Sequence, residues 1–195
     1  MRALLRWIGR LRPSLLGLVA ALLAGLLVHI GTVLSLTHIG AAPGYLALSK
    51  LSSTNQMTVL EPVSAGHQPL PFMAPSERYA ICRFDLRKGP VAINVKLGGD
   101  DWMVAVYSPN GDNVYAISGA DLARHDAEIV LASRDDGLGA ALPIARDGNV
   151  TTSVSLASRT GIAVVSAPVA RAAYGPVAEQ LLGQATCTQQ MRVQG

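Results

Sequence analysis

An uncharged apolar run, Leu15–Leu36, constrains this chain more than any other feature, and its sequence is LLGLVAALLAGLLVHIGTVLSL. With Ser14 included, 23 consecutive residues carry no formal charge. A helix of that length is about 35 Å long at about 1.5 Å per residue, enough to cross a hydrocarbon core of about 30 Å. The run therefore predicts one transmembrane helix, with the lipid bilayer as its partner.

Four arginines precede the run and predict its orientation. Arg2, Arg6, Arg10 and Arg12 lie before it, and the first charged residue after it is Lys50. Basic residues that flank a transmembrane helix stay on the cytoplasmic side. We therefore expect a cytoplasmic N-terminus and a C-terminal domain on the opposite side of the membrane.

The remaining charge argues against a nucleic acid partner. Of 16 basic residues, 12 are left once these four are set aside, against 13 acidic residues, so the rest of the chain has a net charge of about −1. A near-neutral domain lacks the basic surface on which polynucleotide binding depends.

A cleaved signal peptide is the alternative interpretation of the run. Gly40, Ala41 and Ala42 offer small residues of the kind found at a cleavage site. The apolar run is longer than the usual region of about 7–15 residues, and Pro43 would directly follow the cut. These two observations favour an uncleaved anchor.

Two features inside the run suggest further roles. His29 is an ionisable residue at membrane depth, but one helix alone cannot form a proton pathway, so we interpret it as a neutral residue near the interface. Gly17, Ala21 and Gly25 recur every four residues, a spacing that can form a helix-pairing face and also arises by chance.

The chain divides into four segments. They are a cytoplasmic basic segment (1–13), the transmembrane helix (14–37), a Pro/Ser-rich membrane-proximal segment (38–77) and a β-rich domain (78–195). Five of the eleven prolines lie in residues 41–76, which argues against long regular elements there. Within that stretch we expect a short helix at 45–51, an edge strand at 57–60 and otherwise an irregular covering of the domain surface.

From residue 79 onward, short β-prone runs alternate with turn signals. In YAICRFDL, alternation places Ala80, Cys82, Phe84 and Leu86 on one face and Tyr79, Ile81, Arg83 and Asp85 on the other. The next run directs Val91, Ile93, Val95 and Leu97 inward. The runs at 102–108 and 161–169 are apolar on both faces, as central strands are.

In the second half of the domain, the sequence pattern predicts further strands at 127–133 and 150–156, and a short strand at 142–145. Pro176 suits the first turn of a helix, and residues 176–190 are expected to form an amphipathic helix that carries Cys187. The fold class is therefore mainly β: an antiparallel, jelly-roll-like β-sandwich with one N-terminal transmembrane helix and a short C-terminal helix.

Two motifs resemble a known family. Ala80, Cys82, Arg83, Phe84, Asp85, Leu86, Gly89 and Pro90 match an A-x-C-R-[FY]-D-L strand followed by a Gly-Pro turn. Val106, Tyr107, Gly111, Asn113 and Tyr115 match an aromatic-rich hairpin, with Ala105 where serine is common. The chain resembles the small single-pass bacterial inner-membrane proteins of domain of unknown function 1254, which implies a periplasmic domain of unassigned biochemistry.

The sequence contains no nucleophile elbow, HExxH, phosphate loop or CxxC motif, so it predicts no catalytic residue, cofactor or metal ion. Asp100, Asp101 and residues 110–113 offer oxygen ligands for calcium, but Asp, Asn and Gly are also what tight turns require, and we favour the turns. Arg83 and Asp85 share a strand face and could pair with each other or with neighbouring strands.

Two other pairs of side chains are candidates for contact. Tyr107 and Tyr115 flank the hairpin at 108–112 and are expected to pack across it. Cys82 and Cys187 could form a disulfide in an oxidising compartment, and two separately buried thiols are the alternative.

Three functional hypotheses remain. The first is a non-enzymatic, membrane-anchored periplasmic module that binds a protein partner or an envelope ligand. The second is an accessory subunit of a membrane enzyme or transporter complex, docked through Gly17, Ala21 and Gly25. The third is a carbohydrate- or lipid-active enzyme that uses acids such as Asp85 and Asp101.

Overall fold

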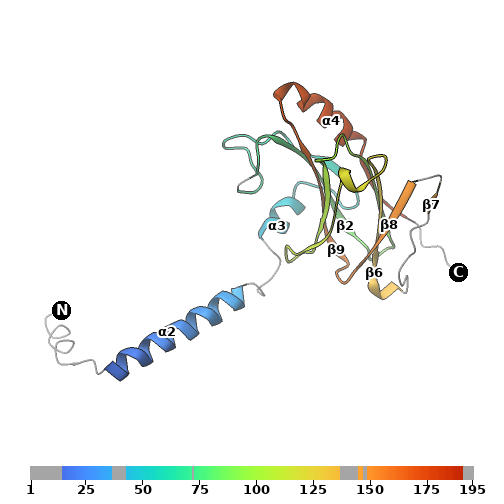
Figure 1. The fold of residues 1–195 in the computed structure, drawn as a ribbon. Coiled ribbons are helices and arrows are strands. Elements are labelled where there is room, and N and C mark those ends of the chain that lie inside the picture. Colours follow the sequence, from blue (N-terminus) through green and yellow to red (C-terminus); the bar gives the residue numbers. More distant parts are fainter. Residues whose placement is uncertain (1–14, 37–42, 72, 137–144, 147–148, 191–195) are drawn as a thin grey trace. The chain divides into compact units, whose positions relative to one another are not determined.

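A computed structural model describes residues 15–36, 43–71, 73–136, 145–146 and 149–190 (Figure 1). The chain forms two compact units, Met1–Gly40 and Ala41–Gly195. The described part of the first unit is the helix α2 (Leu15–Leu36). Its stretch Leu15–Ser35 is long and apolar enough to cross a membrane.

Two hydroxyl side chains of α2, those of Thr32 and Ser35, are satisfied within the helix. The hydroxyl groups of Thr32 and Ser35 donate hydrogen bonds of 2.7 Å to the carbonyl oxygens of Val28 and Gly31, one turn earlier. Such bonds hide hydroxyl groups from an apolar surrounding. The helix therefore presents an almost wholly apolar, exposed surface.

The second unit is a sandwich of two five-stranded sheets. The first sheet has the order β1 (Met57–Val59), β2 (Glu77–Asp85), β9 (Thr160–Pro168), β4 (Met103–Tyr107) and β5 (Asn113–Ser118). The second has the order β10 (Thr186–Gln189), β3 (Val91–Lys96), β6 (Asp126–Ser133), β8 (Asn149–Leu156) and β7 (Ala145–Arg146). The pairing is antiparallel except between β6 and β8, which are parallel, so the expected sandwich is confirmed with one parallel pair.

Strand alternation places the core as the sequence predicts. Four residues of β2 and the position after it were expected to face inward: Ala80, Cys82, Phe84 and Leu86. They lie between the two sheets and are at most 1% exposed. They pack against the inward residues of β3 and against the residue directly after β3: Val91, Ile93, Val95 and Leu97. Apolar residues recurring every second position thus form one continuous core between the sheets.

The strands that are apolar on both faces, β4 and β9, lie inside the first sheet. The outward face of β9 contacts the helix α3 (Pro43–Ser49), which belongs to the membrane-proximal segment, whereas Met103 at the start of β4 is exposed. This helix starts two residues before the predicted position, with Pro43 in its first turn, where a missing N–H costs nothing. The edge strand β1 follows it, also close to the predicted position.

The C-terminal prediction was partly wrong. The helix α4 (Gly175–Gln184) ends before Cys187, and Cys187 lies in β10, opposite Ile93 of β3. Ala185 is already extended, and the TCTQ segment after it has the β-branched residues that suit a strand. The free edge of β3 therefore takes this segment as a strand.

Three 3-10 helices complete the described structure: η1 (Gly119–Asp121), η2 (Arg134–Asp136) and η3 (Ala172–Tyr174). Of the short strand predicted at 142–145, residues 142–144 lie outside the described residues, and Ala145 belongs to β7.

Candidate functional site

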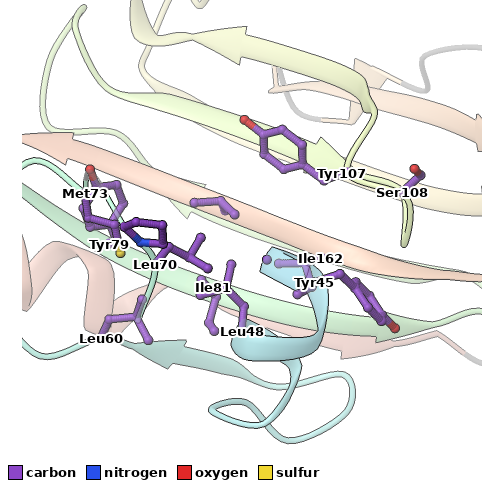
Figure 2. Close-up of a pocket in the computed structure, with 14 residues that line it drawn as sticks. Tyr45, Leu48, Leu60, Leu70, Met73, Tyr79, Ile81, Tyr107, Ser108 and Ile162 are labelled. Atoms are coloured by element: carbon purple, nitrogen blue, oxygen red, sulfur yellow. The ribbon is translucent and has the colours of Figure 1, made fainter. Parts of the chain in front are cut away.

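An apolar cavity of about 340 Å³ lies on the outer face of the first sheet (Figure 2). We call it the outer groove. Its aliphatic lining comes from α3, from the chain that follows β1, and from β2 and β9: Leu48, Leu60, Leu70, Ile81, Ile162 and Val164. This volume is at the lower end of the range of about 300–1,000 Å³ that is usual for ligand pockets.

Strand register explains the floor of the outer groove. Ile81 of β2 lies directly opposite Val164 of β9. Ile162, two positions before Val164 on β9, lies on the same face of the sheet. These outward side chains alternate with Ala80, Cys82, Ala163 and Val165, which face the core. These outward side chains pack with Leu48 of α3 and with Leu60, so that Ile81 and Ile162 are at most 2% exposed and form the buried floor of the groove.

Tyr79 and Tyr45 lie at opposite ends of the outer groove (Figure 2). The hydroxyl oxygen of Tyr79 accepts a hydrogen bond of 3.4 Å from the backbone N–H of Ala74. At the other end Tyr45 of α3 also lines a second, smaller cavity of about 230 Å³. We call this second cavity the arginine pocket, because Arg83 and Arg87 line it.

Within the arginine pocket, Arg83 and Asp85 do not pair with each other in the described structure. The carboxylate Oδ1 of Asp85 accepts a hydrogen bond of 3.0 Å from the Arg87 backbone N–H and lies 3.6 Å from the Arg87 Nε. The Nη2 of Arg83 donates to the hydroxyl oxygen of Thr54. The Nε of Arg83 is buried and has no hydrogen-bond partner among the described residues.

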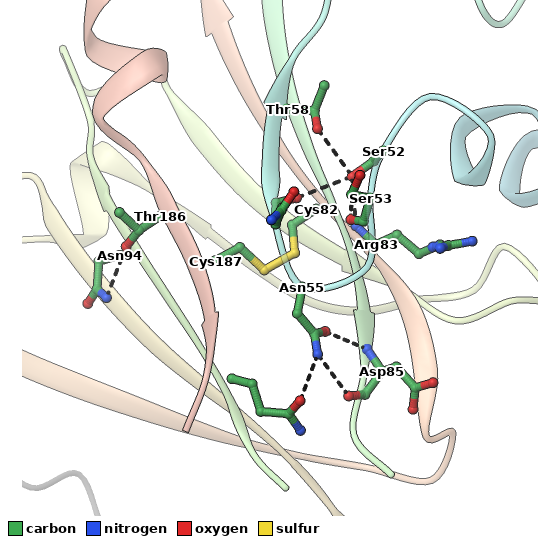
Figure 3. Close-up of a disulfide and its surroundings, with 12 residues drawn as sticks. Ser52, Ser53, Asn55, Thr58, Cys82, Arg83, Asp85, Asn94, Thr186 and Cys187 are labelled. Carbon is green, nitrogen blue, oxygen red and sulfur yellow. Dashed lines mark hydrogen bonds between the residues drawn. A yellow bond between two sulfur atoms is a disulfide. The ribbon is translucent and has the colours of Figure 1, made fainter. Parts of the chain in front are cut away.

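The predicted cysteine pair is joined. Cys82 of β2 and Cys187 of β10 form a disulfide with a Cα–Cα distance of 6.3 Å, which links the two sheets through the core (Figure 3). Gly89 and Pro90 form the turn of the first motif. The backbone N–H of Gln190, directly after β10, donates a hydrogen bond of 2.8 Å to the Pro90 carbonyl oxygen. Gly89 has a φ of 138°, a conformation that favours glycine.

Asn55 was not singled out from the sequence, although it ties three segments together (Figure 3). Its Oδ1 accepts a hydrogen bond of 2.8 Å from the Asp85 N–H, and its Nδ2 donates to the Asp85 carbonyl oxygen and to the Gln189 Oε1. Its φ of 56° is one that Asn adopts more readily than most residues. An Asn in a turn is too common a signal to have predicted this role.

The hairpin motif is divided between two surfaces, so the expected packing of Tyr107 against Tyr115 was wrong. Tyr115 lies opposite Val106 and packs against the core, whereas Tyr107 lies opposite Asn113 and lines the outer groove. Gly111, with a φ of 89°, completes the turn and also lines the groove.

Two of the candidate oxygen ligands, Asp112 and Asp100, contact other side chains, the first within its own loop and the second in a different loop. The Ser108 hydroxyl donates to the Asp112 carboxylate at 3.0 Å, and Asp100 contacts His125 Nε2 at 2.8 Å. In the part of the chain that the structure describes, no group of three His, Cys, Asp or Glu residues is arranged to hold a metal ion. Asp85 and Asp101, the acids named for an enzyme, line different cavities.

Burial changes the acidity of Tyr79. The pKa of its hydroxyl is raised above the usual 10.0, because burial disfavours the phenolate and because Glu77 accepts a hydrogen bond and adds negative charge. The folded protein therefore holds this proton more tightly than the unfolded chain does. The stability contributed by Tyr79 is fully present below pH 10 and is lost as the pH rises through the folded pKa.

We therefore expect Tyr79→Phe to reduce the loss of stability at alkaline pH. Urea unfolding of the full chain at a series of pH values on both sides of 10 measures this effect. Tyr174→Phe, at an exposed tyrosine, is the control and should keep the wild-type slope. Equal slopes for wild type and Tyr79→Phe would contradict the assignment.

Comparisons with known proteins show similarity at the level of the fold. No family model and no curated protein matches the chain. The crystal structure of the VPA0106 protein from Vibrio parahaemolyticus is similar with a TM-score of 0.54 and 12% identity, over 73% of this chain and 32% of that one. An uncharacterised protein from Burkholderia cenocepacia has a TM-score of 0.45 and 11% identity, over 70% of this chain and 34% of that one. The matched region thus spans about a third of each of these longer proteins.

Proposed function

We propose that this protein is a membrane-anchored module whose β domain binds an apolar envelope ligand in the outer groove. The observation that carries the proposal is the groove itself, an apolar cavity of about 340 Å³ on the outer face of the first sheet. Few polar groups line it, so its chemistry is suited to holding an aliphatic group.

The anchor in this proposal is α2, with its N-terminus in the cytoplasm and the β domain in the periplasm. Four arginines before the helix and none directly after it support this orientation. The Cys82–Cys187 disulfide supports it independently, because disulfides persist in oxidising compartments and are rare in the cytosol.

The proposal includes membership of the family of domain of unknown function 1254, on the basis of the two sequence motifs. Their residues have defined roles in the β domain: Phe84 is buried in the core, Gly89 and Pro90 form a turn, and Tyr107 lines the outer groove. Such a distribution suits a motif that maintains both the sandwich and its groove.

A glycine in α3 allows a direct test of the groove. A Cβ added at Gly44 would lie 3.7 Å from the Leu70 side chain, an ordinary contact distance, so a larger side chain can be introduced there without backbone strain. We expect Gly44→Phe to fill the outer groove and to reduce ligand binding about tenfold or more, since the ligand loses the volume that it would occupy. Gly183→Phe is the matched control, because a Cβ at Gly183 of α4 meets only open space.

The measurement uses the full chain in intact membranes and a long-chain alcohol that carries a photoreactive diazirine. Cross-linked peptides are mapped by mass spectrometry, and labelling of residues 70–81 is normalised to labelling of Leu15–Leu36. The wild type and Gly183→Phe should be labelled in the groove, and Gly44→Phe should not. Labelling confined to Leu15–Leu36 in the wild type, or equal groove labelling in Gly44→Phe, would refute the proposal.

A further inference from the structure

We propose that the ligand of the outer groove is an anionic amphiphile, whose acyl chain lies in the groove and whose carboxylate or phosphate binds Arg83 in the arginine pocket. The inference rests on the proposed function and specifies its ligand. Three observations carry it: the position of Arg83 on the sheet, its lack of an acidic partner, and the wall that the two cavities share.

Arg83 continues the floor of the outer groove. It follows Ile81 by two residues on the same face of β2, and it lies directly opposite Ile162 of β9, which lines the groove. Side chains two residues apart on one strand face are about 7 Å apart. An aliphatic chain in the outer groove, whose nearly buried floor includes Ile81 and Ile162, therefore has a cation next to one of its ends.

Among the described residues, no acidic side chain forms an ion pair with Arg83. Arg78, on the same strand, shows the contrast, because its Nε lies 2.9 Å from the carboxylate of Glu179. The one carboxylate that lines the arginine pocket, Asp85, accepts a hydrogen bond from Arg87. With Arg83, Arg87 and Asp85 together, the pocket has a net charge of about +1 and complements one anionic group.

Tyr45 lines both the outer groove and the arginine pocket, so the two cavities adjoin at this residue. Thr54 and Thr160 also line the arginine pocket, and the Thr54 hydroxyl oxygen accepts a hydrogen bond from the Nη2 of Arg83. An apolar cavity that adjoins a small cationic one matches a molecule with an aliphatic tail and an anionic head. A guanidinium is well suited to that head, because its planar N–H groups can bind a carboxylate or a phosphate with two hydrogen bonds.

The length of the connecting chain favours a lipid over a peptide as the occupant. Residues 37–42 are the only residues between the apolar helix and α3, which lines the groove. Six residues extend the backbone by at most about 22 Å. In the proposed arrangement α2 spans a bilayer, which would supply a single-chain amphiphile.

The test compares a diazirine-bearing fatty acid with the neutral alcohol of the same chain length, again on the full chain in intact membranes. Groove labelling by each probe is normalised to labelling of Leu15–Leu36, which corrects for the different membrane concentrations of the probes. We expect the fatty acid to label the groove about tenfold more than the alcohol, the ratio that about 1.4 kcal/mol of additional binding energy would give.

Arg83→Gln should abolish this preference and leave labelling by the alcohol unchanged, because glutamine keeps much of the aliphatic stem and loses the charge. Arg124→Gln is the matched control and should keep the full preference, since Arg124 is exposed and lines neither the outer groove nor the arginine pocket. Thermal unfolding of each variant shows whether the fold is retained.

Each outcome separates the two proposals. Equal groove labelling by acid and alcohol in the wild type, or a preference that survives in Arg83→Gln, would overturn the assignment of Arg83 and leave the apolar groove intact. Absence of groove labelling by both probes would overturn the proposed function itself. If inorganic phosphate competes with the probe as effectively as a fatty acid does, the site binds a free anion. That result would overturn the proposal that the ligand is an amphiphile.

Discussion

Replacing both cysteines, as Cys82→Ala/Cys187→Ala, is expected to lower the free energy of unfolding of the β domain by about 4–5 kcal/mol. The reason is the length of the loop that the disulfide closes, 105 positions along the chain, because cross-linking distant residues removes much conformational entropy from the unfolded state. Single domains are stable by only about 5–15 kcal/mol in total. Loss of this bond would therefore remove a large fraction of the stability.

Urea unfolding of the full chain in detergent micelles, followed by tryptophan fluorescence, measures the effect. Trp102 is 6% exposed and packs in the core between the sheets, so its emission reports on the opening of the sandwich. The wild type with a strong reductant is the control and should approach the midpoint of the double variant. A wild-type midpoint that does not change on reduction would contradict the prediction.

The same bond tests the proposed compartment. Cells that express the full chain can be lysed under denaturing conditions with a thiol-alkylating reagent present. A periplasmic domain should be recovered with Cys82 and Cys187 protected from alkylation until a reductant is added. Alkylation of both thiols without reductant would indicate a reducing environment and would remove the main structural support for the proposed topology.

Local sequence pattern was sufficient to predict the core of the sandwich. In YAICRFDL the side chains at even positions face the core, because strand geometry alternates faces irrespective of tertiary context. The central position of β9 also followed from the sequence, since a strand that is apolar on both faces must be covered on both. These predictions depend on only a few neighbouring residues, which explains their success.

The features that could not be predicted depend on distant partners. Residues 186–189 form a strand because the edge of β3, more than ninety positions earlier, is free to pair with them. Tyr107 and Tyr115 lie on opposite faces because the hairpin register places Tyr115 opposite Val106, and a shift of one residue reverses the face of a side chain.

The outer groove required the same kind of distant information. Its floor was visible in the sequence as the outward apolar residues Ile81, Ile162 and Val164. Its walls come from α3 and the Pro-rich chain around Leu70, whose path over the sheet no local pattern specifies. The sequence thus indicated that the outer face needed a cover, but not that the cover would leave a cavity.

The second large effect is expected from Phe84→Ala, which should lower the free energy of unfolding by about 3–5 kcal/mol. Phe84 is 1% exposed, and its ring lies between the two sheets. Its strand partner is Gly161 of β9, where an added Cβ would come within 2.4 Å of the ring atom Cζ. The ring therefore occupies the space that the absent side chain of Gly161 leaves, and no neighbouring side chain on that strand position can move in to fill the cavity.

Tyr174→Ala is the matched control for this prediction, because Tyr174 is 56% exposed and removal of an exposed aromatic ring usually changes stability by no more than about 0.5 kcal/mol. Urea unfolding of both variants under the conditions used for the cysteine variant gives the comparison directly. A similar small change in both would mean that Phe84 is not a core residue, and would contradict the position of β2 in the sandwich. A large loss in Phe84→Ala alone would instead establish that the aromatic position of the YAICRFDL motif serves stability.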